Sequence, residues 1–222
     1  CSALRILYVQ ADVAPPFLTM LYGAMDQLSV GDPWDYANDL GPIIDPTAQK
    51  NIVRHIGHAR DNGRLLHQIA APTRGTFIGP AVISVTGIRD IAREIFGPVL
   101  HVATYRADQL DEIVDDINAA GYGLTFAMHS RIDGRVARVT SRLRIGNIYI
   151  NRDQIGAVVA SQPFGGEGLS GTGPKAGGPS YVQRFTKHKT LQPRAVIGDL
   201  AVLSRVQQTI EDRKSTRLNS SH

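Results

Sequence analysis

The sequence predicts an α/β fold built around a parallel sheet. Strand-like apolar runs alternate with amphipathic helical segments at short spacing over residues 99–150, a pattern typical of strand–helix–strand units with right-handed crossovers. The composition of the 222 residues is 42% hydrophobic, 20% charged and 6% aromatic, as in ordinary globular proteins of one large or two small domains. It excludes a disordered chain, a collagen and a coiled coil.

The first half of the chain is expected to alternate strands with two helices. A strand-like run covers Ser2 to Gln10, and Asp12 is expected to cap a helix that has Pro15 in its first turn. After a Gly/Pro/Asp-rich loop, a second helix is expected to end near Asn62, closed by Gly63. The expected apolar positions are Phe17, Leu18, Leu21, Met25 and Leu28 in the first helix, and Ile52, Val53, Ile56 and Ala59 in the second.

The remaining elements follow from the same periodicities. Strands are expected at 65–70, 81–85, 99–105, 124–130 and 145–150, and helices at 108–120 and 134–143. Regular periodicity stops between residues 151 and 179, where glycines crowd an irregular segment. A long loop of this kind in a compact domain is often functional.

The glycine-rich segment contains a formal G-x-G-x-x-G at Gly166, Gly168 and Gly171. It has no strand before it and no helix start after it, so it is not a dinucleotide-binding fingerprint. Pro174 separates glycine from lysine, which excludes a Walker A loop. Two interpretations stay open: the glycines expose backbone N–H groups to an anionic or carbonyl ligand, or they are purely structural.

Charge and cysteine content exclude several other classes. Lys and Arg number 24 against 20 Asp and Glu, and a net charge of +4 gives no reason to expect a nucleic-acid partner unless the charges cluster. No apolar run of about 18 residues predicts a membrane span. The single cysteine, Cys1, excludes an intramolecular disulfide and a multi-cysteine zinc site, and it fits a reducing compartment.

Neither end of the sequence is expected to be the natural end of the protein. No methionine precedes Cys1, so the start is interpreted as a truncation. Residues 212–222 are polar and aperiodic and resemble a translated sequencing-library adapter, with a genuine disordered tail as the alternative. Without them, 21 basic and 19 acidic residues leave a net charge of +2.

Two groups of titratable residues are interpreted as surface features, and no metal site is expected. His55 and His58 are spaced i, i+3 on a predicted helix, but the helix has no carboxylate at a zincin position and its other polar residues indicate a solvated face. One predicted helix also carries four acidic residues, which are interpreted as a wet surface rather than paired catalytic acids. They are Asp111, Glu112, Asp115 and Asp116.

Three segments, in order and at similar spacing, resemble the aldehyde dehydrogenase superfamily. They are C-S-A-L-R at residues 1–5, E-I-F-G-P-V at 94–99 and P-F-G-G-E-G-L-S-G at 163–171. The resemblance runs from Cys1 to about Leu191. More narrowly, residues 151–159 and 177–179 resemble the L-glutamate γ-semialdehyde (1-pyrroline-5-carboxylate) dehydrogenases, above all the C-terminal dehydrogenase part of bifunctional proline utilization A flavoproteins.

The resemblance implies NAD-dependent oxidation of L-glutamate γ-semialdehyde to L-glutamate in proline catabolism. It makes Cys1 the catalytic nucleophile, whose thiolate forms a thiohemiacetal and then a thioester. It makes Glu94 the carboxylate that binds the NAD ribose and Phe96 the aromatic residue beside the nicotinamide. The implied substrate-binding residues are Ser2, Gly156, Ala157 and Phe164.

The resemblance also implies how the enzyme is organised. Residues 1–180 would form the catalytic domain with an anchor loop at 151–180, and residues 181–211 a C-terminal oligomerisation strand, at Gln183 to Leu191, with a tail. The family's NAD-binding half and general-base glutamate are not found, so the 222-residue chain is expected to be inactive alone. A small aldehyde substrate, a homo-oligomer and a bacterial cytoplasmic location are expected, with a peripheral inner-membrane location as the alternative for a full-length bifunctional form. FAD is expected only if a proline dehydrogenase domain precedes this segment.

Three alternatives stay open. The first is an aldehyde dehydrogenase of another substrate specificity, and the second is a non-catalytic pseudoenzyme or oligomerisation partner. The third is a thiol acyltransferase or peptidase, in which Cys1 would need a nearby histidine base. His101, His129 and His188 are the candidates for that base, but no motif supports them.

Overall fold

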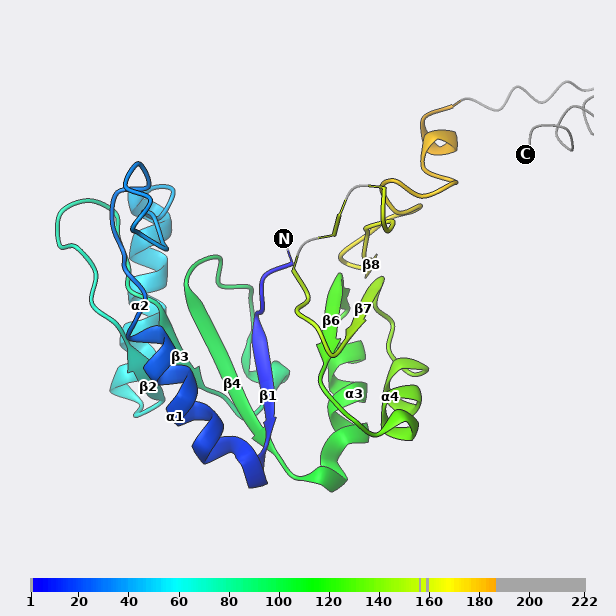
Figure 1. The fold of residues 1–222 in the computed structure, drawn as a ribbon, viewed down its shortest axis with the longest axis horizontal. Helices are drawn as coiled ribbons and strands as arrows, with labels where there is room; N and C mark the ends of the chain where they lie inside the picture. The colour runs from blue at the N-terminus through cyan, green and yellow to red at the C-terminus, as the bar shows by residue number, and fades with distance from the viewer. Residues whose placement is uncertain (1, 156, 159, 187–222) are drawn as a thin grey trace, which may run out of the picture. The chain divides into compact units, whose positions relative to one another are not determined.

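The computed structural model describes residues 2–155, 157–158 and 160–186. The chain divides into two compact units, Cys1–Arg184 and Phe185–His222, and the elements below belong to the first, apart from the last residue of η4. This unit has the predicted α/β character, with strands and helices alternating along the chain (Figure 1). Among the described residues, no helix is long and apolar enough to cross a bilayer.

The main sheet has four strands in the order β1-β4-β3-β2. Strands β1 (Ile6–Gln10), β4 (Val99–Tyr105) and β3 (Ala81–Ser84) are parallel, as predicted, whereas β2 (Leu65–Gln68) pairs antiparallel with β3. The prediction of a purely parallel sheet is therefore wrong at this edge. No helix lies between β2 and β3, so the chain returns without the crossover that parallel pairing requires.

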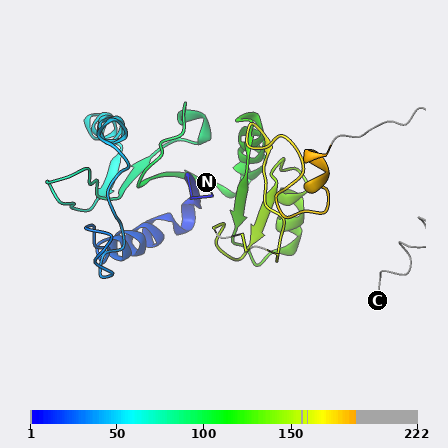
Figure 2. The same ribbon diagram turned by 90° about the horizontal axis from the view of Figure 1, so that it is seen from above.

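Helices α1 (Ala14–Met25) and α2 (Pro46–Asp61) cover opposite faces of the main sheet (Figure 2). Successive side chains of β3 point to opposite faces of the sheet, so the core is divided between the two helices. Ala81 and Ile83 pack with α2, while Val82 packs with α1. The α2 cluster is Ile52, Ile56, Ala59, Ile78, Ala81, Ile83 and Val99. The α1 cluster is Val9, Ala14, Met25, Val82 and Val102.

The helix boundaries confirm some of the predicted details and correct others. Asp12 does not cap α1, since it lies in the 3-10 turn η1 (Ala11–Val13) and Val13 is the cap residue. Val53 is 54% exposed, so it does not belong to the apolar face of α2. Gly63 has a φ of +66° and ends α2 as predicted, in a left-handed conformation that glycine adopts without strain.

The second half of the first unit contains a separate parallel pair, β6 (Thr125–Met128) with β7 (Asn147–Ile150). Helix α3 (Leu110–Ala119) precedes β6 and packs against α4 (Asp133–Thr140), the helix that joins the two strands. A short antiparallel pair, β5 (Tyr122–Gly123) with β8 (Glu167–Gly168), links this region to the glycine-rich segment. The short 3-10 turns are η2 (Ile88–Asp90), η3 (Ala107–Gln109) and η4 (Val182–Phe185).

The predicted C-terminal strand, Gln183 to Leu191, is not a strand in the part that the structure describes, residues 183–186. Residues 183–185 lie in the 3-10 turn η4, and residues 187–191 lie outside the described part of the chain.

Candidate active site

The segment predicted to carry the nucleophile runs into β1 and is held through two backbone carbonyls. Cys1 itself lies outside the described residues. The carbonyl of Ser2 accepts a hydrogen bond from Gln154 Nε2 at 3.3 Å. The carbonyl of Arg5 accepts bonds from the backbone N–H of His101 at 3.4 Å and from its Nδ1 at 3.2 Å. Contacts from distant parts of the chain therefore fix both ends of this short segment.

Gln154 brings two groups of predicted site residues together. It lies in the predicted anchor loop, where Ala157 is half-buried and Gly156 lies outside the described residues. Its bond to Ser2 makes the anchor loop a neighbour of the nucleophile segment. The sequence analysis did not select Gln154, because a single glutamine in a loop carries no periodic or motif signal.

The loop that carries Glu94 and Phe96 connects η2 to β4. Ile95 packs on the α2 cluster, while the side chains on either side of it, Glu94 and Phe96, are exposed. A Cβ at Gly97 would lie 2.4 Å from Ile52 Cδ1, so glycine allows the loop to lie directly against α2. The partly buried Ile95 thus leaves the carboxylate and the aromatic ring accessible to a ligand.

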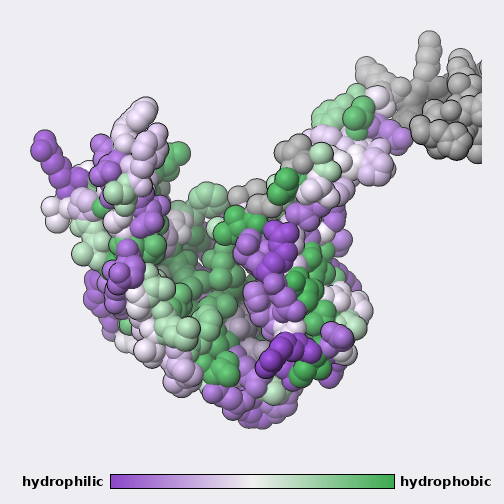
Figure 3. Space-filling view, viewed as in Figure 1, coloured by the Kyte–Doolittle hydropathy of each residue, from purple (hydrophilic) through white to green (hydrophobic). Residues whose placement is uncertain are grey.

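Exposure alone does not identify Phe96 as a binding residue. Its side chain is 77% exposed, but Trp34 and Tyr36 in the loop between α1 and α2 are 88% and 98% exposed. The space-filling view likewise shows hydrophobic residues at several places on the surface, among hydrophilic ones (Figure 3). The assignment of Phe96 therefore depends on its place in the E-I-F-G-P segment, next to Glu94.

The glycine-rich segment folds around the buried side chain of Asn147 in β7. Asn147 Nδ2 donates to the Pro163 carbonyl at 3.0 Å, and its Oδ1 accepts from the Gly165 N–H at 3.1 Å. Phe164, between them, is half-buried and forms a two-way backbone bridge with Ala176. The predicted substrate-lining residue is therefore held on both sides by the backbone.

Close backbone approaches explain several of the glycines. A Cβ at Gly146 would lie 1.9 Å from the Gly165 carbonyl oxygen, and one at Gly171 would lie 1.9 Å from the Gly166 carbonyl oxygen. Real Cβ atoms do not come this close, so only glycine fits at these positions. Ser170 also takes part, because its Oγ accepts from the Gly123 N–H at 3.1 Å. These contacts favour the structural interpretation of these glycines.

A pair of histidines, of which His101 is buried and His55 is partly buried, lies beside the nucleophile segment. His55 of α2 and His101 of β4 have their Nε2 atoms 2.9 Å apart, and His101 is only 1% exposed. Burial lowers the pKa of both imidazoles from the ordinary value. The predicted solvated face is therefore wrong for His55, although His58 on the same helix is exposed.

The three histidines considered as alternative bases for Cys1 differ in their contacts and exposure. Both ring nitrogens of His101 are engaged, one with Arg5 and one with His55. His129 is exposed after β6, and His188 lies outside the described residues. The engaged nitrogens of His101 disfavour a histidine-assisted peptidase.

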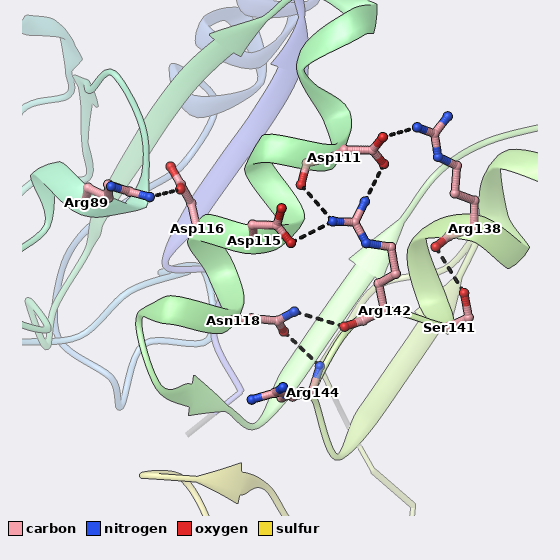
Figure 4. A network of polar contacts seen from close by, with 9 residues as sticks. All are labelled: Arg89, Asp111, Asp115, Asp116, Asn118, Arg138, Ser141, Arg142 and Arg144. Carbon is pink, nitrogen blue, oxygen red and sulfur yellow. Dashed lines mark hydrogen bonds and ion pairs between the residues drawn. The ribbon is translucent and has the colours of Figure 1, made fainter.

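The acidic residues of α3 form an ion-pair network (Figure 4). Asp111 pairs with Arg138 and with Arg142 Nη1 at 2.6 Å, and Arg142 Nη2 reaches Asp115 at 2.6 Å. Asp116 pairs with Arg89 of η2 at 2.5 Å. The surface location was predicted, but the arginine partners come from elements distant in sequence. Exposed pairs contribute roughly 0.2–1 kcal/mol each to stability. Because these carboxylates are paired with arginines, we interpret the network as a small contribution to stability rather than as catalytic acids.

Comparison with known proteins gives a consistent result. Residues 1–191 match the aldehyde dehydrogenase family. The bifunctional protein PutA of Klebsiella aerogenes is 47% identical over 89% of this chain, which spans 16% of that protein. A PutA structure from Bradyrhizobium japonicum superposes with a TM-score of 0.81 at 47% identity, covering 84% of this chain and 19% of that one. A Thermus 1-pyrroline-5-carboxylate dehydrogenase with bound NAD gives a TM-score of 0.76 at 32% identity, covering 85% of this chain and 37% of that one.

Proposed function

This chain belongs to the aldehyde dehydrogenase family, and on that premise we propose that it serves an NAD-dependent enzyme that oxidises L-glutamate γ-semialdehyde to L-glutamate. Both kinds of relative named above support this choice, since one is a 1-pyrroline-5-carboxylate dehydrogenase and the other a PutA protein. The chain spans only a small part of their length, so the activity is proposed for the whole protein that contains it.

The contact between Gln154 and Ser2 is the observation that carries the proposal. The semialdehyde has an aldehyde at one end and an α-carboxylate with an ammonium group at the other. An enzyme selective for it must hold the carboxylate at a fixed distance from the nucleophile. The bond of Gln154 Nε2 to the Ser2 carbonyl joins the loop that contains residue 154 to the segment that contains residue 2, which supports this arrangement.

The proposed chemistry begins with the Cys1 thiolate. Its sulfur attacks the aldehyde carbon, and the carbonyl π electrons move to oxygen to give a tetrahedral thiohemiacetal. NAD, when bound, supplies the two-electron oxidant that converts this adduct to a thioester. Water then adds to the thioester, the C–S bond breaks, and glutamate leaves while the thiolate is restored.

The loop at Glu94 fits a dinucleotide. A carboxylate accepts hydrogen bonds from the two hydroxyls of a ribose, and Glu94 is exposed on a loop that the partly buried Ile95 anchors. Phe96, 77% exposed, offers an aromatic surface two residues away. Glu94 would hold the ribose and Phe96 would contact the nicotinamide end.

The proposed substrate clamp uses neutral donors. The Ser2 hydroxyl and the N–H groups of Gly156 and Ala157 would bind the α-carboxylate, and Phe164 would line the aliphatic chain. Hydrogen bonds to a charged group are worth roughly 1.5–3 kcal/mol each. Two or three of them suffice for selectivity over an uncharged aldehyde. We also propose a homo-oligomer in the cytoplasm, with FAD only in a longer form that has a proline dehydrogenase domain.

The test is a hybrid enzyme in which the aligned part of this chain replaces that of Klebsiella aerogenes PutA. NADH formation is followed with L-glutamate γ-semialdehyde and with propanal. We expect much higher catalytic efficiency with the semialdehyde and a complete loss of NADH formation in Cys1→Ala. Ser2→Ala should lower efficiency for the semialdehyde while leaving propanal unchanged. Equal efficiency on both aldehydes would refute the substrate assignment, and no turnover would favour a pseudoenzyme.

A further inference from the structure

The histidine pair is connected to the nucleophile segment through a single carbonyl. The rings of His55 and His101 meet edge to face at 67°, with their Nε2 atoms 2.9 Å apart. On its other side, His101 Nδ1 lies 3.2 Å from the Arg5 carbonyl oxygen, which the His101 backbone N–H also contacts. A continuous path of polar contacts therefore runs from α2 through β4 to Arg5.

The chemistry of the groups determines the direction of each hydrogen bond. A carbonyl oxygen can only accept, so His101 Nδ1 must carry a proton. In neutral His101 the Nε2 atom is then an acceptor, and His55 Nε2 must donate to it. The donation runs from His55 to His101 to the Arg5 carbonyl, and successive hydrogen bonds of this kind strengthen one another.

The charged groups around the pair favour its neutral form. They are Arg93 before β4, His58 on α2, Arg64 after α2 and Arg5 before β1. All four are basic. Burial is the main cause that lowers the pKa of both rings. Arg64 lowers it further for both, Arg93 and His58 for His55, and the Arg5 guanidinium for His101, whose hydrogen bond to the Arg5 carbonyl opposes the shift.

We propose that His55 and His101 are positioning residues for the nucleophile segment, which they hold through the Arg5 carbonyl while at least one ring is neutral. The role in catalysis rests on the proposed function, since it takes Cys1 as the nucleophile. At 2.9 Å the two Nε2 atoms have room for one proton between them. When both rings are charged, each Nε2 carries a proton and the contact between the rings breaks, so His55 no longer fixes the orientation of the His101 ring that bonds Arg5.

Two amide variants of His101 distinguish a role in positioning Arg5 from a role in packing alone. Asparagine places its amide N–H where Nδ1 lies, so His101→Asn retains the donor to Arg5 and cannot titrate. Glutamine places its amide near Nε2, so His101→Gln loses that donor. The exposed His58 on the same helix as His55 provides the control, as His58→Asn.

The first experiment determines the tautomers by nitrogen NMR on the labelled 222-residue chain. At neutral pH we expect neutral His101 with its proton on Nδ1, and neutral His55 with its proton on Nε2. His101 protonated on Nε2 alone, or charged at neutral pH, would overturn the proposal. This measurement involves no catalysis, so it stands even if the proposed function fails.

The second experiment follows turnover and the rate of Cys1 alkylation by iodoacetamide against pH in the hybrid enzyme. We expect His101→Gln to lower both rates about tenfold at neutral pH, and His58→Asn to leave them unchanged. His101→Asn should keep most of the rate. In acid both enzymes slow because the Cys1 thiolate is protonated, and His101→Asn should lack the further decline that we expect from the histidine pair in the parent hybrid.

Equal loss in His101→Asn and His101→Gln, or an unchanged acid decline in His101→Asn, would contradict the positioning role. If the hybrid forms no NADH, the proposed function fails. The alkylation rates of the same variants then decide the positioning role by the same criteria.

Discussion

Asn147 and Gly165 are joined by a hydrogen bond in which the buried carboxamide oxygen accepts from the glycine N–H at 3.1 Å. The same side chain donates to the Pro163 carbonyl at 3.0 Å. One residue at the start of β7 thus fixes the backbone on both sides of Phe164. The position of the proposed substrate-lining ring depends on a residue that touches no substrate.

Replacing Asn147 should therefore affect both stability and substrate binding. Asn147→Leu removes the hydrogen bonds to the partly buried Pro163 carbonyl and Gly165 N–H, and each lost hydrogen bond costs about 0.5–1.5 kcal/mol. We expect the free energy of unfolding to fall by that order, measured with denaturant on the 222-residue chain. In the hybrid enzyme, KM for the semialdehyde should rise. Unchanged stability in Asn147→Leu would contradict the assignment.

The ion pairs between α3 and α4 should contribute little and depend on salt. We expect Arg142→Ala to lower the free energy of unfolding by about 1 kcal/mol at low ionic strength, because two exposed pairs are lost together. The effect should shrink at high salt, where exposed charges are screened. Among the described residues, Arg135 of α4 takes part in no ion pair, so Arg135→Ala is the matched control. A salt-independent loss would indicate packing of the Arg142 side chain instead.

Periodicity and motifs predicted the bounds of local elements well. They could not predict contacts between residues that are far apart in the sequence. The strand at Val99–Tyr105 matches its predicted bounds, because a run rich in β-branched and apolar residues lies between a proline and a polar turn. The antiparallel direction of β2 depends on the path of the chain through residues 69–80, which no local pattern records.

In the candidate site, too, residues in contiguous motifs could be predicted, whereas residues that contact distant parts of the chain could not. Glu94 and Phe96 were found from a contiguous motif, and the structure places both on an exposed loop. Gln154, Asn147 and the His55–His101 pair act across the fold, so no spacing in the sequence joins them to their partners. A weak signal existed for Asn147, since an amide inside an apolar strand needs a buried hydrogen-bond partner.

Two glycine-to-alanine changes should have opposite effects. At Gly171 an added Cβ would lie 1.9 Å from the Gly166 carbonyl oxygen, so Gly171→Ala should destabilise the chain by about 1–3 kcal/mol through overpacking. Gly57 lies inside α2 with nothing within 4 Å of an added Cβ. Gly57→Ala should stabilise the chain by up to about 1 kcal/mol through helix propensity. Thermal and denaturant unfolding of both variants provide the measurement, and a tolerated Gly171→Ala would show that the loop can relax.

Asp90 should make the loop that leads to Glu94 sensitive to acid. Its carboxylate accepts from the Thr86 N–H at 2.8 Å and the Thr86 hydroxyl at 2.9 Å, and it pairs with Arg64 at 2.5 Å. The Thr86 backbone bond is the largest cause that lowers the pKa of Asp90, and the Thr86 hydroxyl and Arg64 lower it further against the opposing effect of burial. These contacts fix the turn η2, directly before the loop that carries Glu94 and Phe96.

The direction of the pH dependence follows from that lowered pKa. An unfolded aspartate titrates near about pH 3.9, so between that value and the lower folded pKa the unfolded chain binds more protons. The stability due to Asp90 is therefore fully present above about pH 3.9 and is lost as pH falls through the folded pKa. Asp90→Asn should lower the free energy of unfolding at neutral pH by about 1 kcal/mol and remove part of its acid dependence. Measuring denaturant unfolding of the parent and Asp90→Asn across this range tests the assignment, and parallel curves would contradict it.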